Sequence, residues 1–482
     1  MPADLPPSAD HPDPTPDALI AARPYLARHA MDGLLLEGVP LAAIAQSVGT
    51  PTWVYGAATI RARFHALAAA LAEGRLPAHI HFAVKANDHL AVLRLLGREG
   101  AGADVVSAGE LLRARAAGIP ASRVVFSGVG KTAADLRLAL GLGIAQVNVE
   151  SAEELAMLSD VAAGMGRVAP VALRVNPDVD AGTHAKISTG RARDKFGIPY
   201  VSAAALYAHA ATLPGIDPCG LAMHIGSQIR TLAPFRAAYD RIAGLVRDLR
   251  AAGQRVAVVD CGGGLAIPYR DEPVAGPVGL AGAIAAAFGG LDVELLIEPG
   301  RWLVGPAGVL LASVILVKRD GESRFVVLDA AMNDLLRPAM YDAWHGIVPV
   351  AAADLVGRLA PADVVGPVCE SSDTFARDRA LPPLAPGALV AILDAGAYGA
   401  VMSSTYNARP LAAEVLVNGG ADVGPDAGPQ DGTGVGADDR ANIGADDGAR
   451  GQRRPAVRWA VIRPRQDVAT LWRDETVPDW LK

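Results

Sequence analysis

Hydrophobic positions along the first two thirds of the chain occur in short Val- and Ile-rich runs that alternate with helical Ala-, Leu- and Arg-rich segments. Continuous apolar strands separated by helices predict a parallel sheet that is buried on both faces. The predicted strands cover residues 79–85, 103–107, 123–127, 145–149, 170–175, 220–225, 256–261 and 294–298. Eight strands over roughly 220 residues are typical of a (β/α)8 barrel, here within residues 50–305. A doubly wound open sheet is the alternative, but it usually has fewer strands and a glycine fingerprint after the first.

After about residue 305 the pattern changes to β-type runs that have no long helices between them. These runs cover residues 309–317, 323–329, 389–393 and 457–462. They favour a β-rich second domain, a barrel or sandwich formed by residues 17–49 and 306–482.

Two segments contain too little apolar bulk to offset the entropy of ordering them. Residues 1–16 are rich in Pro and Asp, and we expect a disordered arm. Residues 419–452 are dominated by Gly, Asp and Ala, and we expect a disordered insertion within the β-rich domain.

Composition narrows the class of protein further. The chain has 482 residues, 51% of them apolar and 20% charged, as expected for a globular protein of two domains. A net charge of −7 gives no reason to expect nucleic acid or an anionic membrane as a partner. Three scattered cysteines do not suit a disulfide framework or a zinc site. With no apolar run of membrane-spanning length and no signal pattern, we expect a cytoplasmic protein.

Lys85 ends the first predicted strand, inside the apolar run 79–85. An ammonium in such surroundings loses hydration, which lowers its pKa and favours the neutral, nucleophilic amine used in Schiff-base chemistry. The alternative is a lysine at a strand end whose head reaches water.

Other strand ends carry a complementary set of groups. In barrels of this kind the active site lies at the carboxyl ends of the strands. Those ends carry Asp104, Ser107, His224, Ser227, the run Gly262–Gly264, Glu298, Gly300 and Arg301. Each of these features taken alone has a simpler interpretation. His224 would be a polar residue at the barrel rim, the glycines would form a flexible turn, and Glu298 would form an ion pair with Arg301.

Together these residues suit pyridoxal phosphate. The lysine forms the Schiff base, and the glycine turn with Ser227 binds the phosphate. The ring of His224 stacks on the cofactor, and Glu298 keeps its pyridine nitrogen protonated.

The motifs around these residues resemble those of the pyridoxal-phosphate-dependent decarboxylases of the alanine-racemase-like fold, most closely the branch that acts on meso-diaminopimelate. The resemblance runs from about residue 53 to 416 and resumes after the insertion. Its motifs are HFAVKAN (81–87), GADVVSAGEL (102–111), KISTGRARDKFGIP (186–199), HIGSQ (224–228), CGGG (261–264), EPGR (298–301), RPAMYDAWH (337–345), CESSD (369–373) and DAGAYGAVMSSTYNARP (394–410).

This resemblance implies a role for each matching residue. The implied catalytic residues are Lys85, His224 and Cys369, where Cys369 donates a proton across a dimer interface. The implied cofactor ligands are Lys85, Asp104, His224, Ser227, Gly263, Gly264, Glu298, Gly300, Arg301 and Tyr398. The implied substrate ligands are Arg301, Arg337, Tyr341, Glu370 and Tyr398, with Glu370 on the distal ammonium. Apart from the resemblance, Cys369 reads as a small buried hydrophobe, and Arg337 with Tyr341 as a helix-surface pair.

The resemblance also implies an obligate homodimer with shared sites. It further implies conversion of meso-2,6-diaminoheptanedioate to L-lysine and carbon dioxide, the last step of lysine biosynthesis. Decarboxylases of ornithine, arginine or carboxynorspermidine and an amino-acid racemase are the alternatives among enzymes. A cofactor-free homologue that serves as a binding protein is the alternative of another class.

Overall fold

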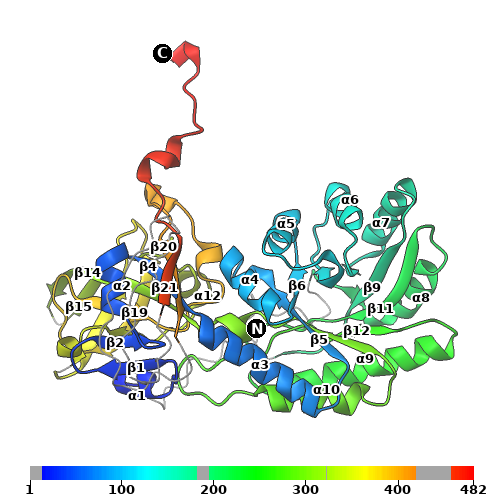
Figure 1. Cartoon of the computed structure of the whole chain (residues 1–482), viewed down its shortest axis with the longest axis horizontal. Helices are drawn as coiled ribbons and strands as arrows, with labels where there is room; N and C mark the ends of the chain where they lie inside the picture. Colours follow the sequence, from blue (N-terminus) through cyan, green and yellow to red (C-terminus); the bar gives the residue numbers. More distant parts are fainter. Residues whose placement is uncertain (1–12, 182–194, 322, 356, 420–457, 482) are drawn as a thin grey trace, which may run out of the picture.

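The computed structural model describes residues 13–181, 195–321, 323–355, 357–419 and 458–481. A barrel surrounded by helices lies on one side of the molecule and a β-rich domain on the other (Figure 1). No described helix has the length and apolar character needed to cross a membrane.

Parallel strands form the closed barrel that the sequence predicts. They are β5 (Ala78–Ala83), β6 (Gly102–Val105), β7 (Val124–Phe126), β8 (Gln146–Val149), β9 (Ala169–Asn176), β11 (Ile216–Ala222), β12 (Val258–Asp260) and β13 (Glu294–Ile297). Pairing of β13 with β5 and of β8 with β9 closes the sheet, which excludes the doubly wound alternative. A two-residue strand, β10 (Ile198–Pro199), also pairs with β9.

Helices cover the outside of the barrel. They are α3 (Ala57–Glu73), α4 (Leu90–Arg98), α5 (Ala108–Ala116), α6 (Ala133–Leu142), α7 (Ala152–Gly164), α8 (Tyr200–Ala210), α9 (Ala233–Ala251) and α10 (Pro277–Phe288), with the 3-10 turn η2 (Ala121–Arg123). The side chains of Ser107, Thr132 and Ser151 cap α5, α6 and α7 by accepting a hydrogen bond from a backbone N–H three residues on. These caps begin each helix soon after a strand, which keeps the loops at the carboxyl ends of those strands short.

The second domain is β-rich, as predicted. Its strands are β4 (Thr52–Gly56), β14 (Gly308–Asp320), β15 (Ser323–Leu328), β16 (Ile347–Pro349), β17 (Ala360–Val365), β18 (Thr374–Leu381), β19 (Leu389–Ile392), β20 (Ala413–Asn418) and β21 (Arg458–Arg463), with the 3-10 turn η4 (Ala352–Leu355). Because β4 pairs with β14 and β20, assignment of residues 52–56 to the barrel is wrong. Trp53 and Tyr55 are buried in the core of this second sheet, which holds the segment there.

Residues before β4 pack on the same domain. They form α1 (Pro16–Ala21), β1 (Leu26–His29), β2 (Gly33–Leu36), β3 (Val39–Pro40) and α2 (Leu41–Val48). The disordered arm was predicted too long, since Asp13 forms ion pairs with Arg270 and Arg379 at 3.4 and 3.3 Å. The first twelve residues and residues 420–452 of the predicted insertion lie outside the described residues. The chain ends in η7 (Val468–Trp472) and η8 (Asp479–Leu481), which project away from the β-rich domain (Figure 1).

Candidate active site

A pocket opens at the carboxyl ends of the barrel strands, where the sequence places the active site. Its lining includes eight of the predicted site residues, namely Lys85, His224, Ser227, Gly264, Glu298, Gly300, Arg301 and Tyr398. The structure therefore brings together groups from β5, β11, β12, β13 and the β-rich domain at one place.

Lys85 lies just beyond its strand, not within it. Strand β5 ends at Ala83, and Lys85 follows in the 3-10 turn η1 (Val84–Ala86). Its Nζ donates a hydrogen bond to Asp104 Oδ2 at 3.0 Å, because Ala83 and Asp104 face each other on adjacent strands. Burial lowers the pKa of Lys85, but the charges of Asp104 and Glu298 outweigh burial and raise the pKa above its ordinary value. The lowered pKa expected from the sequence is therefore wrong.

Glu298 belongs to a cluster of buried polar groups inside the barrel mouth. Ser127 donates to its Oε1 at 3.3 Å, and the Asn148 amide, 3.1 Å from the Ser127 hydroxyl, donates to Asp260 at 2.9 Å. Burial raises the pKa of Glu298 well above its usual range, and the nearby Asp104 and Asp260 carboxylates raise it further. The sequence reading missed Ser127 and Asn148, although each is a polar residue within a predicted apolar strand.

The glycine turn after β12 admits no side chains. Gly262 and Gly264 have positive φ values of 67° and 104°. A Cβ on Gly263 would lie 2.1 Å from the carbonyl oxygen of Glu298, and one on Gly264 would lie 2.4 Å from that of Gly226. The turn is thus fixed against the neighbouring strand ends, which favours an anion site over a merely flexible loop.

His224 is oriented by this turn. The N–H of Gly263 donates to its Nδ1 at 3.2 Å, so the neutral ring carries its proton on Nε2. Burial, followed by the positive charges of Arg174 and Lys85, holds the pKa of His224 well below its ordinary value. The pocket wall therefore presents a neutral, flat ring.

Arg301 begins the short helix α11 (Arg301–Val304) and is almost fully buried. Its Nη2 donates to the Ser227 hydroxyl at 3.0 Å and its Nη1 to the Tyr269 hydroxyl at 2.5 Å. Its guanidinium carbon also lies 4.9 Å from the centre of the Tyr398 ring. Tyr269 was missed from the sequence, since it lies in an irregular loop that matches none of the motifs.

Arg337 and Tyr341 lie on α12 (Arg337–Tyr341) in the β-rich domain, outside the pocket lining. Arg337 is 6% exposed, so the reading of these two residues as a helix-surface pair is wrong. Its Nη1 donates to His345 Nε2 at 2.8 Å, and its guanidinium carbon lies 5.0 Å from the centre of the Tyr269 ring. Tyr269 thus lies between Arg337 and the pocket residue Arg301.

Cys369 and Glu370 are exposed in the loop between β17 and β18 and do not line the Lys85 pocket of their own chain. The Cys369 N–H donates to Asn407 Oδ1 at 3.1 Å, and Glu370 accepts from the Tyr406 hydroxyl at 2.6 Å. The reading of Cys369 as a buried hydrophobe is therefore wrong. Asn407 and Tyr406 belong to the 3-10 turn η6 (Tyr406–Ala408), which follows η5 (Ala400–Met402).

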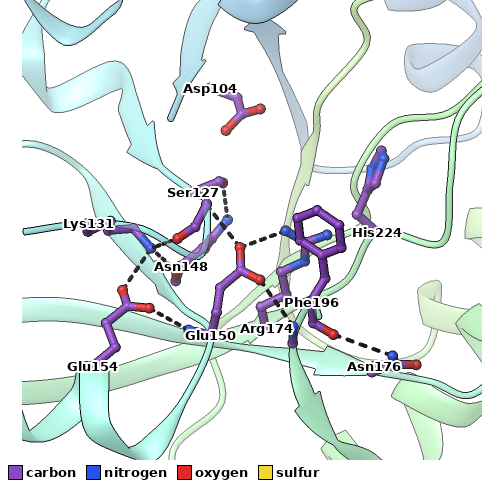
Figure 2. A network of polar contacts seen from close by, with 12 residues as sticks. Asp104, Ser127, Lys131, Asn148, Glu150, Glu154, Arg174, Asn176, Phe196 and His224 are labelled. Atoms are coloured by element: carbon purple, nitrogen blue, oxygen red, sulfur yellow. Dashed lines mark hydrogen bonds and ion pairs between the residues drawn. The ribbon is translucent and has the colours of Figure 1, made fainter. Parts of the chain in front are cut away.

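A second polar network holds the neighbouring loops in place (Figure 2). Glu150 accepts hydrogen bonds from Arg174 at 2.7 Å and from the backbone N–H groups of Gly128 and Gly197. Lys131 is fully buried and donates to Glu154 and to two backbone carbonyls, so it is a structural lysine. The motif KISTGRARDKFGIP covers residues 186–199, and its residues 186–194 lie outside the described part of the chain.

The fold and this site define a class of barrel enzyme with a lysine, a carboxyl group and a glycine turn at one pocket. A family model described as "Pyridoxal-dependent decarboxylase, pyridoxal binding domain" matches residues 57–305. The diaminopimelate decarboxylase of Zymomonas mobilis is 44% identical over 93% of this chain and 98% of that protein. That of Pseudomonas aeruginosa is 51% identical over 80% of this chain and 92% of that protein.

Solved structures agree with these relatives. The structure of diaminopimelate decarboxylase from Helicobacter pylori complexed with L-lysine is 36% identical, with a TM-score of 0.78 over 90% of this chain and 98% of that one. The chain belongs to the pyridoxal-dependent decarboxylase family and, within it, to the diaminopimelate decarboxylases.

Proposed function

We propose that this protein uses pyridoxal 5'-phosphate to decarboxylate meso-2,6-diaminoheptanedioate to L-lysine and carbon dioxide. The observation that carries the proposal is the single pocket that joins Lys85, the glycine turn and Glu298 to Arg301. The relatives named diaminopimelate decarboxylase and the L-lysine complex of the Helicobacter pylori protein support the choice of substrate.

The residues present fit pyridoxal phosphate. The buried carboxyl group of Glu298 lies near those of Asp104 and Asp260, and Lys85 is the only cation among the groups that shift its pKa, so the pocket favours a further cationic group such as a protonated ring nitrogen. The Oδ1 of Asp104 is buried without a hydrogen-bond partner. At the other end, the turn at Gly264 and the hydroxyl of Ser227 suit a phosphate.

When bound, pyridoxal phosphate supplies an aldehyde that condenses with amines and a pyridinium ring that withdraws electrons from the bond being broken. The chain supplies binding and proton control. Asp104 holds the proton on Lys85, Glu298 would hold the ring nitrogen of the cofactor, and the neutral ring of His224 would stack on its ring.

Substrate selection rests on the arginines. A substrate with a carboxylate at the end remote from the reaction would pair with Arg301 and Arg337, each 6% exposed. Ornithine and arginine lack such a carboxylate and would leave buried cations without a countercharge. Tyr341 and Tyr398 complete the proposed substrate site together with the partner's Glu370, which would bind the distal ammonium.

We further propose a homodimer with shared sites, in which the partner's Cys369 returns a proton to the carbon that loses carbon dioxide. The exposure of Cys369 and Glu370 in their own chain supports this arrangement. Equal mixtures of Lys85→Ala and Cys369→Ala protomers should then regain about a quarter of the wild-type activity, because half the dimers carry one intact site. Mixtures with no more activity than either variant would exclude shared sites. A cytoplasmic location stays a prediction.

Two measurements test the proposed reaction. Added pyridoxal phosphate should give a visible absorption band that is lost in Lys85→Ala but kept in Lys318→Ala, since Lys318 is exposed on β14. Carbon dioxide release should then be compared for meso-diaminopimelate, ornithine and arginine. Absence of the band contradicts the cofactor, and faster release from ornithine or arginine contradicts the substrate.

A further inference from the structure

Two buried arginines lie on either side of one tyrosine between the barrel and the β-rich domain. Arg301 and Arg337 are each 6% exposed, and the Nε of Arg301 is buried without a hydrogen-bond partner. Among the residues that the structure describes, neither guanidinium forms an ion pair with a carboxylate. Uncompensated buried cations are costly, so their joint presence indicates that this region receives an anion.

Tyr269 contacts both arginines from the loop between β12 and α10. Its hydroxyl accepts a hydrogen bond from Arg301 Nη1 at 2.5 Å, and the Arg337 guanidinium carbon lies 5.0 Å from the centre of its ring. Two contacts hold the tyrosine in place. Its backbone carbonyl accepts a hydrogen bond from Arg23 at 2.9 Å, and its ring packs edge to face on His345 at 5.2 Å.

His345 fixes the opposite side of Arg337. Burial, followed by the positive charge of Arg337, holds the pKa of His345 well below its ordinary value. The neutral ring accepts the Arg337 hydrogen bond at Nε2 and donates from Nδ1 to the Leu393 carbonyl, both at 2.8 Å. Arg337 is therefore held between His345 and Tyr269, and Arg301 between Tyr269 and Ser227.

We propose that Tyr269 is a positioning residue that sets the specificity for a substrate with a carboxylate remote from the reaction. Its hydroxyl and ring hold the two mutually repelling guanidinium groups close enough to bind the same carboxylate. This inference rests on the proposed function and deepens it, because it assigns the discrimination against basic amino acids to a residue that binds the arginines.

The holoenzyme and two matched probes test the role of Tyr269. L-lysine carries a carboxylate, and 1,5-diaminopentane is the same diamine without it. The variant Tyr269→Phe keeps the ring and removes the hydroxyl. The control is Tyr207→Phe, because the buried Tyr207 hydroxyl donates to the carbonyls of Pro218 and Arg255, neither of which lines the pocket.

Calorimetric titration should show L-lysine binding weakened about tenfold in Tyr269→Phe, the loss expected for one hydrogen bond to a charged group. Binding of 1,5-diaminopentane should be unchanged, as should both affinities in Tyr207→Phe. For meso-diaminopimelate, KM should rise by a similar factor with little change in kcat.

Equal losses for both probes would show that Tyr269 only supports the fold, and unchanged L-lysine binding would also overturn the proposal. The binding measurement does not depend on turnover. A wild-type protein that binds L-lysine but releases no carbon dioxide from meso-diaminopimelate would contradict the proposed function and still leave Tyr269 tested.

Discussion

The Lys85 ammonium lies 3.0 Å from the fully buried carboxylate of Asp104, and this contact keeps the lysine protonated. Because only a neutral amine attacks an aldehyde, the contact opposes attachment of pyridoxal phosphate to the apoprotein. Below the pKa of Lys85, the neutral fraction grows about tenfold for each pH unit.

Replacement of Asp104 by Asn should therefore lower the pKa of Lys85 and shift the attachment rate profile to lower pH. The measurement is the growth of the visible band after pyridoxal phosphate is added between about pH 6 and 9, the range below the lysine pKa. Asp217→Asn is the control, since Asp217 is an exposed partner of Arg255. Superimposable profiles for Asp104→Asn and the wild type would show that Asp104 does not control this proton.

Glu298→Gln should stabilise the apoprotein at alkaline pH, although it removes the proposed partner of the ring nitrogen. Burial raises the pKa of Glu298, so the folded chain keeps a proton that the unfolded chain releases above the ordinary pKa of 4.5. The stability contributed by this group therefore falls as pH rises above 4.5 toward the folded pKa. Gln avoids that loss because it does not ionise.

The melting temperature of the apoprotein at several pH values checks this expectation. The advantage of Glu298→Gln over the wild type should be largest at pH 8 and shrink toward pH 5. Glu294→Gln, at the start of the strand that Glu298 follows, should behave like the wild type, since the Glu294 side chain is 53% exposed. A difference that grows toward acid pH would contradict the raised pKa.

The sequence predicted the barrel well because most of its strands are short, largely apolar runs separated by helical segments, and parallel strands bring their carboxyl ends to one mouth. That rule placed Lys85, His224 and Glu298 at the same end of the barrel from the sequence alone. It could not assign β4 to a domain, because a short apolar run fits the barrel sheet and the sheet of the β-rich domain equally well. Only the pairing of β4 with β14 shows that it belongs to the β-rich domain.

Long-range contacts account for what the sequence did not reveal about the site. The raised pKa of Lys85 depends on the strand register that places Ala83 opposite Asp104. The pattern of apolar residues along each strand does not show which residues of neighbouring strands face each other. Tyr269 lies in an irregular loop, so only folding shows that it lies between Arg301 and Arg337.

Gly263→Ala should disrupt the glycine turn after β12, because a Cβ at this position would lie 2.1 Å from the backbone carbonyl oxygen of Glu298. Relief requires movement of the end of β13, and we expect a loss of about 1–3 kcal/mol in stability with weaker cofactor binding. Melting temperature and cofactor affinity by fluorescence titration are the measurements. Gly282→Ala, in α10 where a Cβ meets open space, should instead gain about 0.5–1 kcal/mol. A Gly263→Ala protein with wild-type affinity would show that the turn adapts.

Asp394→Asn should destabilise the β-rich domain, because it leaves the buried Arg23 without a countercharge. The Asp394 carboxylate accepts a hydrogen bond from Arg23 Nε at 2.9 Å and another from the Tyr25 hydroxyl at 2.8 Å, and its side chain is 2% exposed. Removal of one partner of a buried pair typically costs about 3–5 kcal/mol, whereas an exposed pair contributes about 0–1 kcal/mol. Asp17→Asn is the matched control, since Asp17 pairs with Arg28 at the surface and its side chain is 72% exposed.

Urea unfolding of the two variants compares these costs directly. Arg23 also donates to the Tyr269 carbonyl, so Asp394→Asn should weaken L-lysine binding as well as stability. If both variants unfold at the urea concentration of the wild type, the Arg23–Asp394 pair contributes little to stability. Unchanged L-lysine binding in Asp394→Asn would show that the position of Tyr269 does not depend on this pair.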